Sequence, residues 1–153
     1  MDNFSKSLNK RLVLGVILTG IISLQNIAQL FILITEFWNG APYATEILNA
    51  FLFTFSIIMS FVALIKIWIS GKPFSKTLTN CMSGIGIVYT SASFFACFIP
   101  GVMPTGLQIL GFQFKKLDIF IQGNYLTYGL LMLVFSEVLK YGLEYQHDSE
   151  LTL

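Results

Sequence analysis

Residues 47–70 read ILNAFLFTFSIIMSFVALIKIWIS, an apolar run in which Lys66 carries the only charge. An α-helix rises about 1.5 Å per residue and the hydrocarbon core of a bilayer is about 30 Å thick, so about 20 apolar residues cross it. Ile47–Ser70 meets this length, and three other runs meet or approach it: Leu12–Thr35, Cys81–Gly101 and Leu117–Lys140. The sequence therefore predicts an all-α integral membrane four-helix bundle, with the whole chain forming a single transmembrane domain.

The composition agrees with a lipid environment. Hydrophobic residues make up 55% of the 153-residue chain and charged residues only 11%, whereas soluble domains carry about a quarter charged residues. No segment between the runs is long enough to build a second core. The four apolar runs and this composition lead us to expect the lipid bilayer of the cell membrane as a partner. The net charge of +1 creates no strong positive field, so we expect no direct nucleic acid binding.

The lysines and arginines predict the orientation of the chain. With four spans, both termini share one side of the membrane with the segment 71–76. Seven basic residues lie on that side and two, Lys115 and Lys116, lie on the other; the seven are Lys6, Lys10, Arg11, Lys66, Lys72, Lys76 and Lys140. Basic residues concentrate in cytoplasmic loops. We therefore expect both termini in the cytoplasm, with residues 141–153 as a polar tail.

Helix-breaking and capping residues mark the ends of the predicted spans. Gly40 and Pro42 follow the first run, and Gly71 and Pro73 follow the second. Ser75 is suited to cap the N-terminus of the third helix. The longest connection, which runs from the end of the third span to Lys116, stays fairly apolar. We expect it to lie on the membrane surface or to fold back against the bundle.

Small and polar residues form stripes along the second and third runs at intervals of three or four, which place them on one helix face. The stripe of the second run comprises Asn49, Ser56, Ser60 and Ala63, and that of the third comprises Ser83, Gly86, Thr90, Ser93 and Cys97. Small residues allow helix backbones to approach closely. We interpret both stripes as packing seams, with the lining of a substrate path as the alternative.

The first run carries an unusual set of polar side chains. Thr19, Ser23 and Asn26 share one face, with Gln25 and Gln29 beside it. A carboxamide in hydrocarbon costs a few kcal/mol unless it finds a hydrogen-bond partner. We therefore expect these residues to face the bundle interior, where they join the helices; the alternative is that they line a small polar cavity.

Lys66 and Glu137 are the only ionisable residues well inside the apolar runs, and both lie toward the predicted cytoplasmic ends. Ion-coupled transporters usually place such a group deeper in the bilayer. We expect Lys66 to extend toward the headgroups. We expect Glu137 to form a solvated ladder with Lys140 and Glu144 at helical spacing. The alternative is an ion pair between Lys66 and Glu137 across two helices.

The sequence lacks the motifs of enzymes, because it contains no Gly-rich phosphate loop, GxSxG elbow or HExxH pair. The single histidine, His147, is followed by Asp148 and Glu150, but a metal site needs about three or four ligands. A solvated tail is the better interpretation of these residues. We therefore predict that the protein is not an enzyme and uses no metal or cofactor.

Two segments together resemble a known family. Gly71-Lys72-Pro73-Phe74-Ser75 opens the third span, and the chain closes with Phe135–Gly142 followed by Asp148-Ser149-Glu150-Leu151-Thr152-Leu153. This is similar to the YoaS-like proteins, a family of four-span bacterial membrane proteins with a G-x-P-F-S loop and an acidic D-L-T-type tail. The tail departs from the family pattern, with Tyr145-Gln146-His147 in place of Leu-Gln and acidic residues and Glu150 in place of the aspartate. The resemblance implies a cytosolic regulatory partner, such as a helix-turn-helix protein.

The sequence thus favours a regulatory or interaction protein of the membrane. Its candidate partner-binding residues are Lys72, Pro73, Phe74, Ser75, Asp148, Glu150 and Leu151. One alternative is a small transporter or a lipid- or peptide-binding protein that uses the faces of Asn26, Gln29 and Thr90. The candidate intramembrane polar residues are Asn26, Gln29, Asn49, Thr90, Lys66 and Glu137. Another alternative is immunity against a membrane-active peptide. Four narrow helices enclose little room, so a homodimer is plausible, although no motif specifies it.

Overall fold

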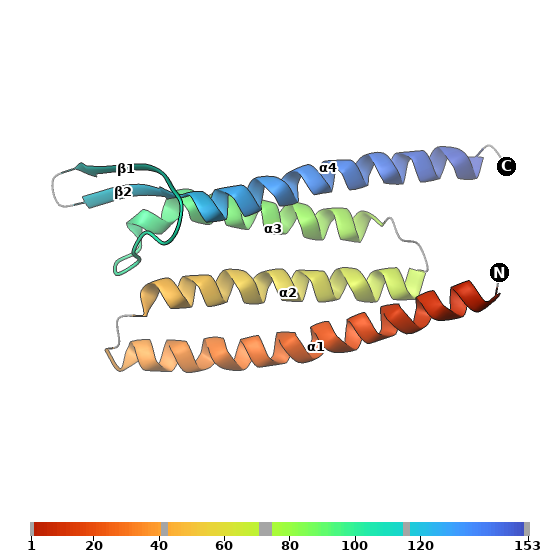
Figure 1. The fold of residues 1–153 in the computed structure, drawn as a ribbon, viewed down its shortest axis with the longest axis horizontal. Helices are drawn as coiled ribbons and strands as arrows, with labels where there is room; N and C mark the ends of the chain where they lie inside the picture. The colour runs from red at the N-terminus through yellow and green to blue at the C-terminus, as the bar shows by residue number, and fades with distance from the viewer. Residues whose placement is uncertain (1, 41–42, 71–74, 115–116, 152–153) are drawn as a thin grey trace.

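The computed structural model describes residues 2–40, 43–70, 75–114 and 117–151. Four long helices dominate it, namely α1 (Asp2–Trp38), α2 (Ala44–Ser70), α3 (Lys76–Phe95) and α4 (Gly123–Leu151) (Figure 1). A 3-10 turn, η1 (Ala96–Phe98), continues α3, and the strands β1 (Gln108–Phe114) and β2 (Leu117–Gln122) form an antiparallel hairpin before α4. The predicted all-α fold with four helices is confirmed, and the small hairpin is an addition to it.

All four helices are long and apolar enough to cross a membrane. The segments that meet this criterion are Lys10–Trp38, Ala44–Ser70, Lys76–Phe98 and Gly123–Tyr145. The predicted cap of the third helix is also confirmed, because Ser75 Oγ accepts a hydrogen bond of 3.1 Å from Leu78 N.

The predicted limits of the fourth span, Leu117–Lys140, are wrong. Residues 117–122 form β2, which pairs with β1 through partners such as Phe112 and Ile119. A short apolar run rich in isoleucine and phenylalanine fits a strand as well as a helix, so hydropathy alone did not separate the two. Helix α4 begins only at Gly123, and the predicted tail is helical as far as Leu151.

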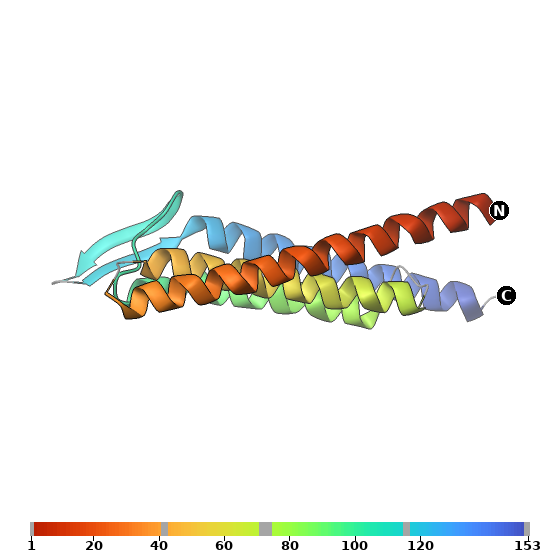
Figure 2. The same cartoon turned by 90° about the horizontal axis from the view of Figure 1, so that it is seen from below.

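The helices form an open bundle in which each helix packs on its neighbour in the sequence. Helix α1 contacts α2, α2 contacts α3, and α3 contacts α4, whereas in the described part of the chain α1 touches neither α3 nor α4. Figures 1 and 2 show this flat arrangement from two directions. Consequently, most large apolar side chains point outward, as expected for lipid as the surrounding solvent.

The two ends of the bundle differ in construction. Helix α1 begins and α4 ends at the same end, while the hairpin lies at the opposite end (Figure 1). At the hairpin end, Ala44, Ala96, Val102 and Phe120 form a buried cluster, which we call the cap. Because Val102 belongs to the cap, part of the long connection folds back against the helices, which is one of the two predicted arrangements.

Candidate functional site

A groove with a volume of about 640 Å³ lies between α2, α3 and α4. Helix α3 forms its floor, because α3 packs along both α2 and α4, while the backbones of α2 and α4 do not approach each other closely in the described residues. The lining residues are Asn49, Leu52, Phe53, Ser56 and Ser60 of α2, Met82, Ile85 and Tyr89 of α3, Asn124, Tyr125, Tyr128 and Met132 of α4, and Thr105 of the connection before β1. None of these side chains is charged.

The end of the groove near the hairpin is polar and aromatic. The Tyr125 hydroxyl donates a hydrogen bond to Asn49 Oδ1 and so links α4 to α2 across the groove. Tyr89 of α3 packs edge-on against two rings of α4, with centroid distances of 6.2 Å to Tyr125 and 6.3 Å to Tyr128. Edge-to-face pairs of this kind stabilise by about 1 kcal/mol beyond their buried area. These contacts fix the shape of the wall, while Asn124 brings a further carboxamide to the same end.

The other end of the groove is apolar. Met82, Ile85 and Met132 line it, and methionine side chains adapt readily to the shape of an apolar partner. Ser56 and Ser60 lie along the same wall, but their hydroxyls donate to carbonyls of α2 itself, to Leu52 O at 2.9 Å and Ser56 O at 2.8 Å. Their hydrogen-bonding capacity is therefore largely used within the helix, so this end suits a hydrocarbon chain.

The length of the groove corresponds to about one leaflet. Its lining on α4 runs from Asn124 to Met132 and its lining on α2 from Asn49 to Ser60. At 1.5 Å per residue these stretches measure about 12 and about 16 Å. The hydrocarbon core is about 30 Å thick, so the groove runs from the hairpin end to roughly the middle of the bilayer.

A hydrogen-bonded clasp holds the connection before β1 at the polar end of the groove. The fully buried Gln122 accepts from Thr105 N at 3.2 Å and donates to Met103 O at 3.1 Å. Met103 N in turn donates to Thr45 Oγ1 at 2.9 Å. The clasp therefore ties this segment to both α2 and β2, and it positions Thr105 in the groove lining. The sequence carries no signal for the role of Gln122, because its two partners are backbone groups.

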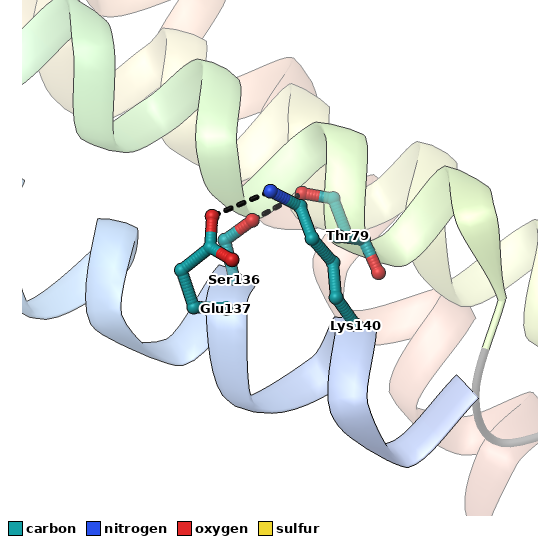
Figure 3. Close-up of polar contacts among 4 residues, drawn as sticks. All are labelled: Thr79, Ser136, Glu137 and Lys140. Atoms are coloured by element: carbon teal, nitrogen blue, oxygen red, sulfur yellow. Dashed lines mark hydrogen bonds and ion pairs between the residues drawn. The ribbon is translucent and has the colours of Figure 1, made fainter. Parts of the chain in front are cut away.

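Helices α3 and α4 meet at glycines, which confirms the predicted packing role of the α3 stripe at Gly86 and Thr90. A Cβ atom added at Gly86 would lie 2.9 Å from Gly129 O, and one added at Gly129 would lie 2.7 Å from Thr90 N. The two backbones therefore touch directly. Nearer the termini, Ser136 Oγ of α4 donates to Thr79 O of α3 at 3.1 Å (Figure 3).

The α2 stripe plays a different part from the packing seam that we predicted. Asn49, Ser56 and Ser60 line the groove, whereas Ala63 is buried among the helices. The same periodicity produces both outcomes, because it fixes which residues share a face but not whether another helix covers that face.

The prediction that the polar residues of α1 face the bundle interior is wrong for Gln25 and Gln29, which are exposed. The reason is that, in the part of the chain that the structure describes, α1 packs on α2 and on no other helix, so one of its faces is covered. The other three polar side chains of this set donate hydrogen bonds to carbonyls of α1 itself. Thr19 Oγ1 donates to Gly15 O, Ser23 Oγ donates to Thr19 O, and Asn26 Nδ2 donates to Ile22 O. The candidates Asn26 and Gln29 therefore do not meet Thr90, which lies in the α3–α4 seam.

The ion pair near the end of α4 forms within that helix, between Glu137 and Lys140. Lys140 Nζ pairs with Glu137 Oε1 one turn away, with both side chains more than half exposed (Figure 3). The alternative pair between Lys66 and Glu137 is not formed among the described residues, where the backbone of α2, which carries Lys66, stays apart from that of α4. Lys66 is exposed.

The candidate partner-binding residues are only partly described. Lys72, Pro73 and Phe74 lie outside the described residues, as do the side chains of Glu150 and Leu151. Ser75 serves as the cap of α3, and Asp148 is exposed on α4. Within the described part of the chain, no three Cys, His, Asp or Glu side chains gather as metal ligands would.

Comparison with protein families, with curated proteins and with solved structures found no match. The resemblance to the YoaS-like family therefore stays a prediction from short motifs, and the function must be argued from the groove.

Proposed function

We propose that the chain is a multi-pass protein of the cell membrane that binds a neutral, lipid-like amphiphile in the groove between α2, α3 and α4. The observation that carries the proposal is the groove itself, with its volume of about 640 Å³, its polar end at the hairpin and its apolar end at mid-helix. Ligand sites are typically clefts of about 300–1,000 Å³ with mostly apolar walls and a few placed polar groups.

The lining defines the chemistry of the ligand. None of the described side chains that line the groove is charged, and a buried charge without a partner is strongly disfavoured. The head of the ligand is therefore uncharged, such as a hydroxyl or ester group that bonds to Asn124 and Thr105. Its tail is a single apolar chain of about one leaflet in length, packed along Met82 and Met132.

The distribution of charge suggests the orientation of the site. The order of the spans in the sequence assigns seven of the nine basic residues to the side of the termini, which favours that side as the cytoplasmic one. The polar end of the groove then opens near the outer surface of the membrane, and the ligand would enter from the outer leaflet.

A second proposal concerns a cytosolic partner and rests on the two helical extensions. Helix α1 begins before Lys10, where its candidate span starts, and α4 continues beyond Tyr145, where its span ends. Both extensions lie at the same end of the bundle (Figure 1). Because α4 lines the groove near its start and projects at its end, it offers one rigid connection between a ligand and a regulatory protein. Deletion of residues 148–153 should leave insertion intact and abolish co-purification of that protein; unchanged capture would contradict this.

The ligand proposal is tested by photolabelling in membranes with a monoacylglycerol that carries a diazirine on its chain. We expect label on the α3 and α4 peptides that contain Met82 and Met132. Ser56→Phe should fill the groove and reduce labelling at least tenfold. Val62→Phe, which enlarges an exposed position on the same helix, is the matched control and should label like the wild type. Equal labelling of the two variants, or label spread over all four helices, would contradict the proposal.

A further inference from the structure

Helix α1 packs on α2 through one face, and among the described residues nothing covers the opposite, mostly apolar face. One series of α1 residues recurs at intervals of three and four, and all of its members are buried or half-buried, as expected for the side that packs on α2: Val16, Thr19, Ser23, Asn26 and Leu30. A second series with the same spacing runs along the opposite side, and all of its members are exposed: Leu14, Leu18, Ile21, Gln25, Ala28 and Ile32. Alternating intervals of four and three form the seam of paired helices. We call this second series the outer seam.

Gln25 lies at the middle of the outer seam and at the middle of the candidate span Lys10–Trp38. It is separated from the two ends by about 22 and about 20 Å of helix, so its side chain cannot reach the headgroups. It forms no hydrogen bond in the described part of the chain. An unsatisfied carboxamide in hydrocarbon costs several kcal/mol, and lipid chains offer no donor or acceptor. The outer seam therefore requires a partner with a polar group at this depth.

A second copy of the chain supplies that group. A carboxamide both donates and accepts hydrogen bonds, so two Gln25 side chains satisfy each other across a two-fold axis. Copies inserted with the same orientation have parallel α1 helices, and an axis along the membrane normal brings identical residues together at the same depth. We propose that the protein forms a parallel homodimer through the outer seam, with a Gln25–Gln25 hydrogen bond at its centre that fixes the register.

The dimer leaves the groove accessible. Among the described residues, none of α1 lines the groove, and α1 packs on α2 but on no other helix. Dimerisation and ligand binding are consequently separate properties, and each can fail without the other.

The seam is tested by disulfide cross-linking of the full chain in native membranes, after replacement of the two free cysteines, Cys81 and Cys97, by alanine. Single cysteines at Leu18 and Ile21 should yield dimers on mild oxidation. Cysteines at Leu24 and Phe31, which are even more exposed than Leu18 and Ile21 but lie off the seam, are the controls and should yield few. Equal cross-linking at all four positions, or adducts with a different protein at Leu18, would overturn the proposal.

The role of Gln25 is tested by counting subunits of labelled protein in liposomes at low density. Gln25→Leu should weaken dimerisation roughly tenfold, and Gln25→Asn should retain most of it. Asn26→Leu makes the same chemical change on the α2 side of the helix and should leave the dimer fraction unchanged. A Gln25→Leu variant that dimerises like the wild type would overturn the proposal, as would a wild-type protein that is monomeric.

Discussion

The α3–α4 pair and the α1–α2 pair are built in different ways from similar residues. Between α3 and α4, the backbones touch at Gly86 and Gly129, and Ser136 donates across the interface to Thr79 O. Along α1, each hydrogen-bonded polar side chain of the described span returns to a carbonyl of its own helix, as Ser23 does to Thr19 O. Gln25 and Gln29 bond to nothing in the described residues.

This difference shows that small and polar residues in a membrane helix can have two structural roles. Where a second helix approaches closely, they specify one geometry, because only a glycine or a hydroxyl fits the contact. Where no backbone approaches, the same residue types do not fix the position of the helix relative to its neighbour, and their polar groups remain available to another partner. We therefore expect α3–α4 to be the rigid part of the molecule and α1 to be its most weakly specified helix.

The largest contrast should come from two alanine substitutions at glycines. A Cβ at Gly129 would press on Thr90 N and Gly86 O, so Gly129→Ala should destabilise the fold by about 2–3 kcal/mol. Gly15 of α1 has no atom within 4 Å of an added Cβ, so Gly15→Ala should be neutral or stabilise by up to about 1 kcal/mol. Unfolding in mixed micelles measures both. Equal destabilisation by the two changes would remove the distinction between the two helix pairs.

The second-largest loss of stability should come from breaking the clasp around Gln122. Gln122→Leu leaves Thr105 N and Met103 O without partners, which costs about 1–3 kcal/mol. The loss should be local, so hydrogen exchange at residues 103–107 should rise strongly while exchange along α1 stays unchanged. Unchanged protection of residues 103–107 would show that the clasp does not hold this segment.

A smaller effect is expected from two buried serines. Ser136→Ala removes an interhelical hydrogen bond and should cost about 0.6–1 kcal/mol. Ser23→Ala removes a bond within α1, where the carbonyl keeps its helical partner, and should cost less than half as much. Unfolding experiments on the two variants measure both losses of stability. A larger loss for Ser23→Ala than for Ser136→Ala would contradict the expected difference between the α1–α2 and α3–α4 pairs.

The smallest effect should be seen at the exposed ion pair of α4. Glu137 and Lys140 are both more than half exposed, and such pairs stabilise by less than about 1 kcal/mol. Glu137→Gln should therefore shift the unfolding transition by less than Gly129→Ala, Gln122→Leu or Ser136→Ala. A loss comparable to that of Gly129→Ala would mean that Glu137 has a partner in an assembly.

The sequence was sufficient for the number of helices, because four long apolar runs have no other common solution. The sequence also predicted that Ser75 caps the N-terminus of α3, and that Gly86 and Thr90 lie in a tight helix–helix interface. It failed at the hairpin, where Leu117–Gln122 joins the following helix in one apolar run. The signal that remained was two runs of aromatic and β-branched residues on either side of Lys115-Lys116, typical of paired strands.

The groove could not be predicted, because its walls come from three helices and depend on how far α2 and α4 stand apart. The series Tyr125, Tyr128 and Met132 is spaced like any buried helix face, and Asn49 and Ser56 look like a packing seam. Only the arrangement of the helices shows that these faces meet without filling the space between them.

Native mass spectrometry of the protein extracted gently from its membrane tests the groove most directly. The account predicts a bound neutral, single-chain amphiphile on the wild type and on Val62→Phe, and its loss from Ser56→Phe. A wild-type protein without such an adduct, or anionic lipid retained equally by all three proteins, would contradict the proposal that this groove is a ligand site.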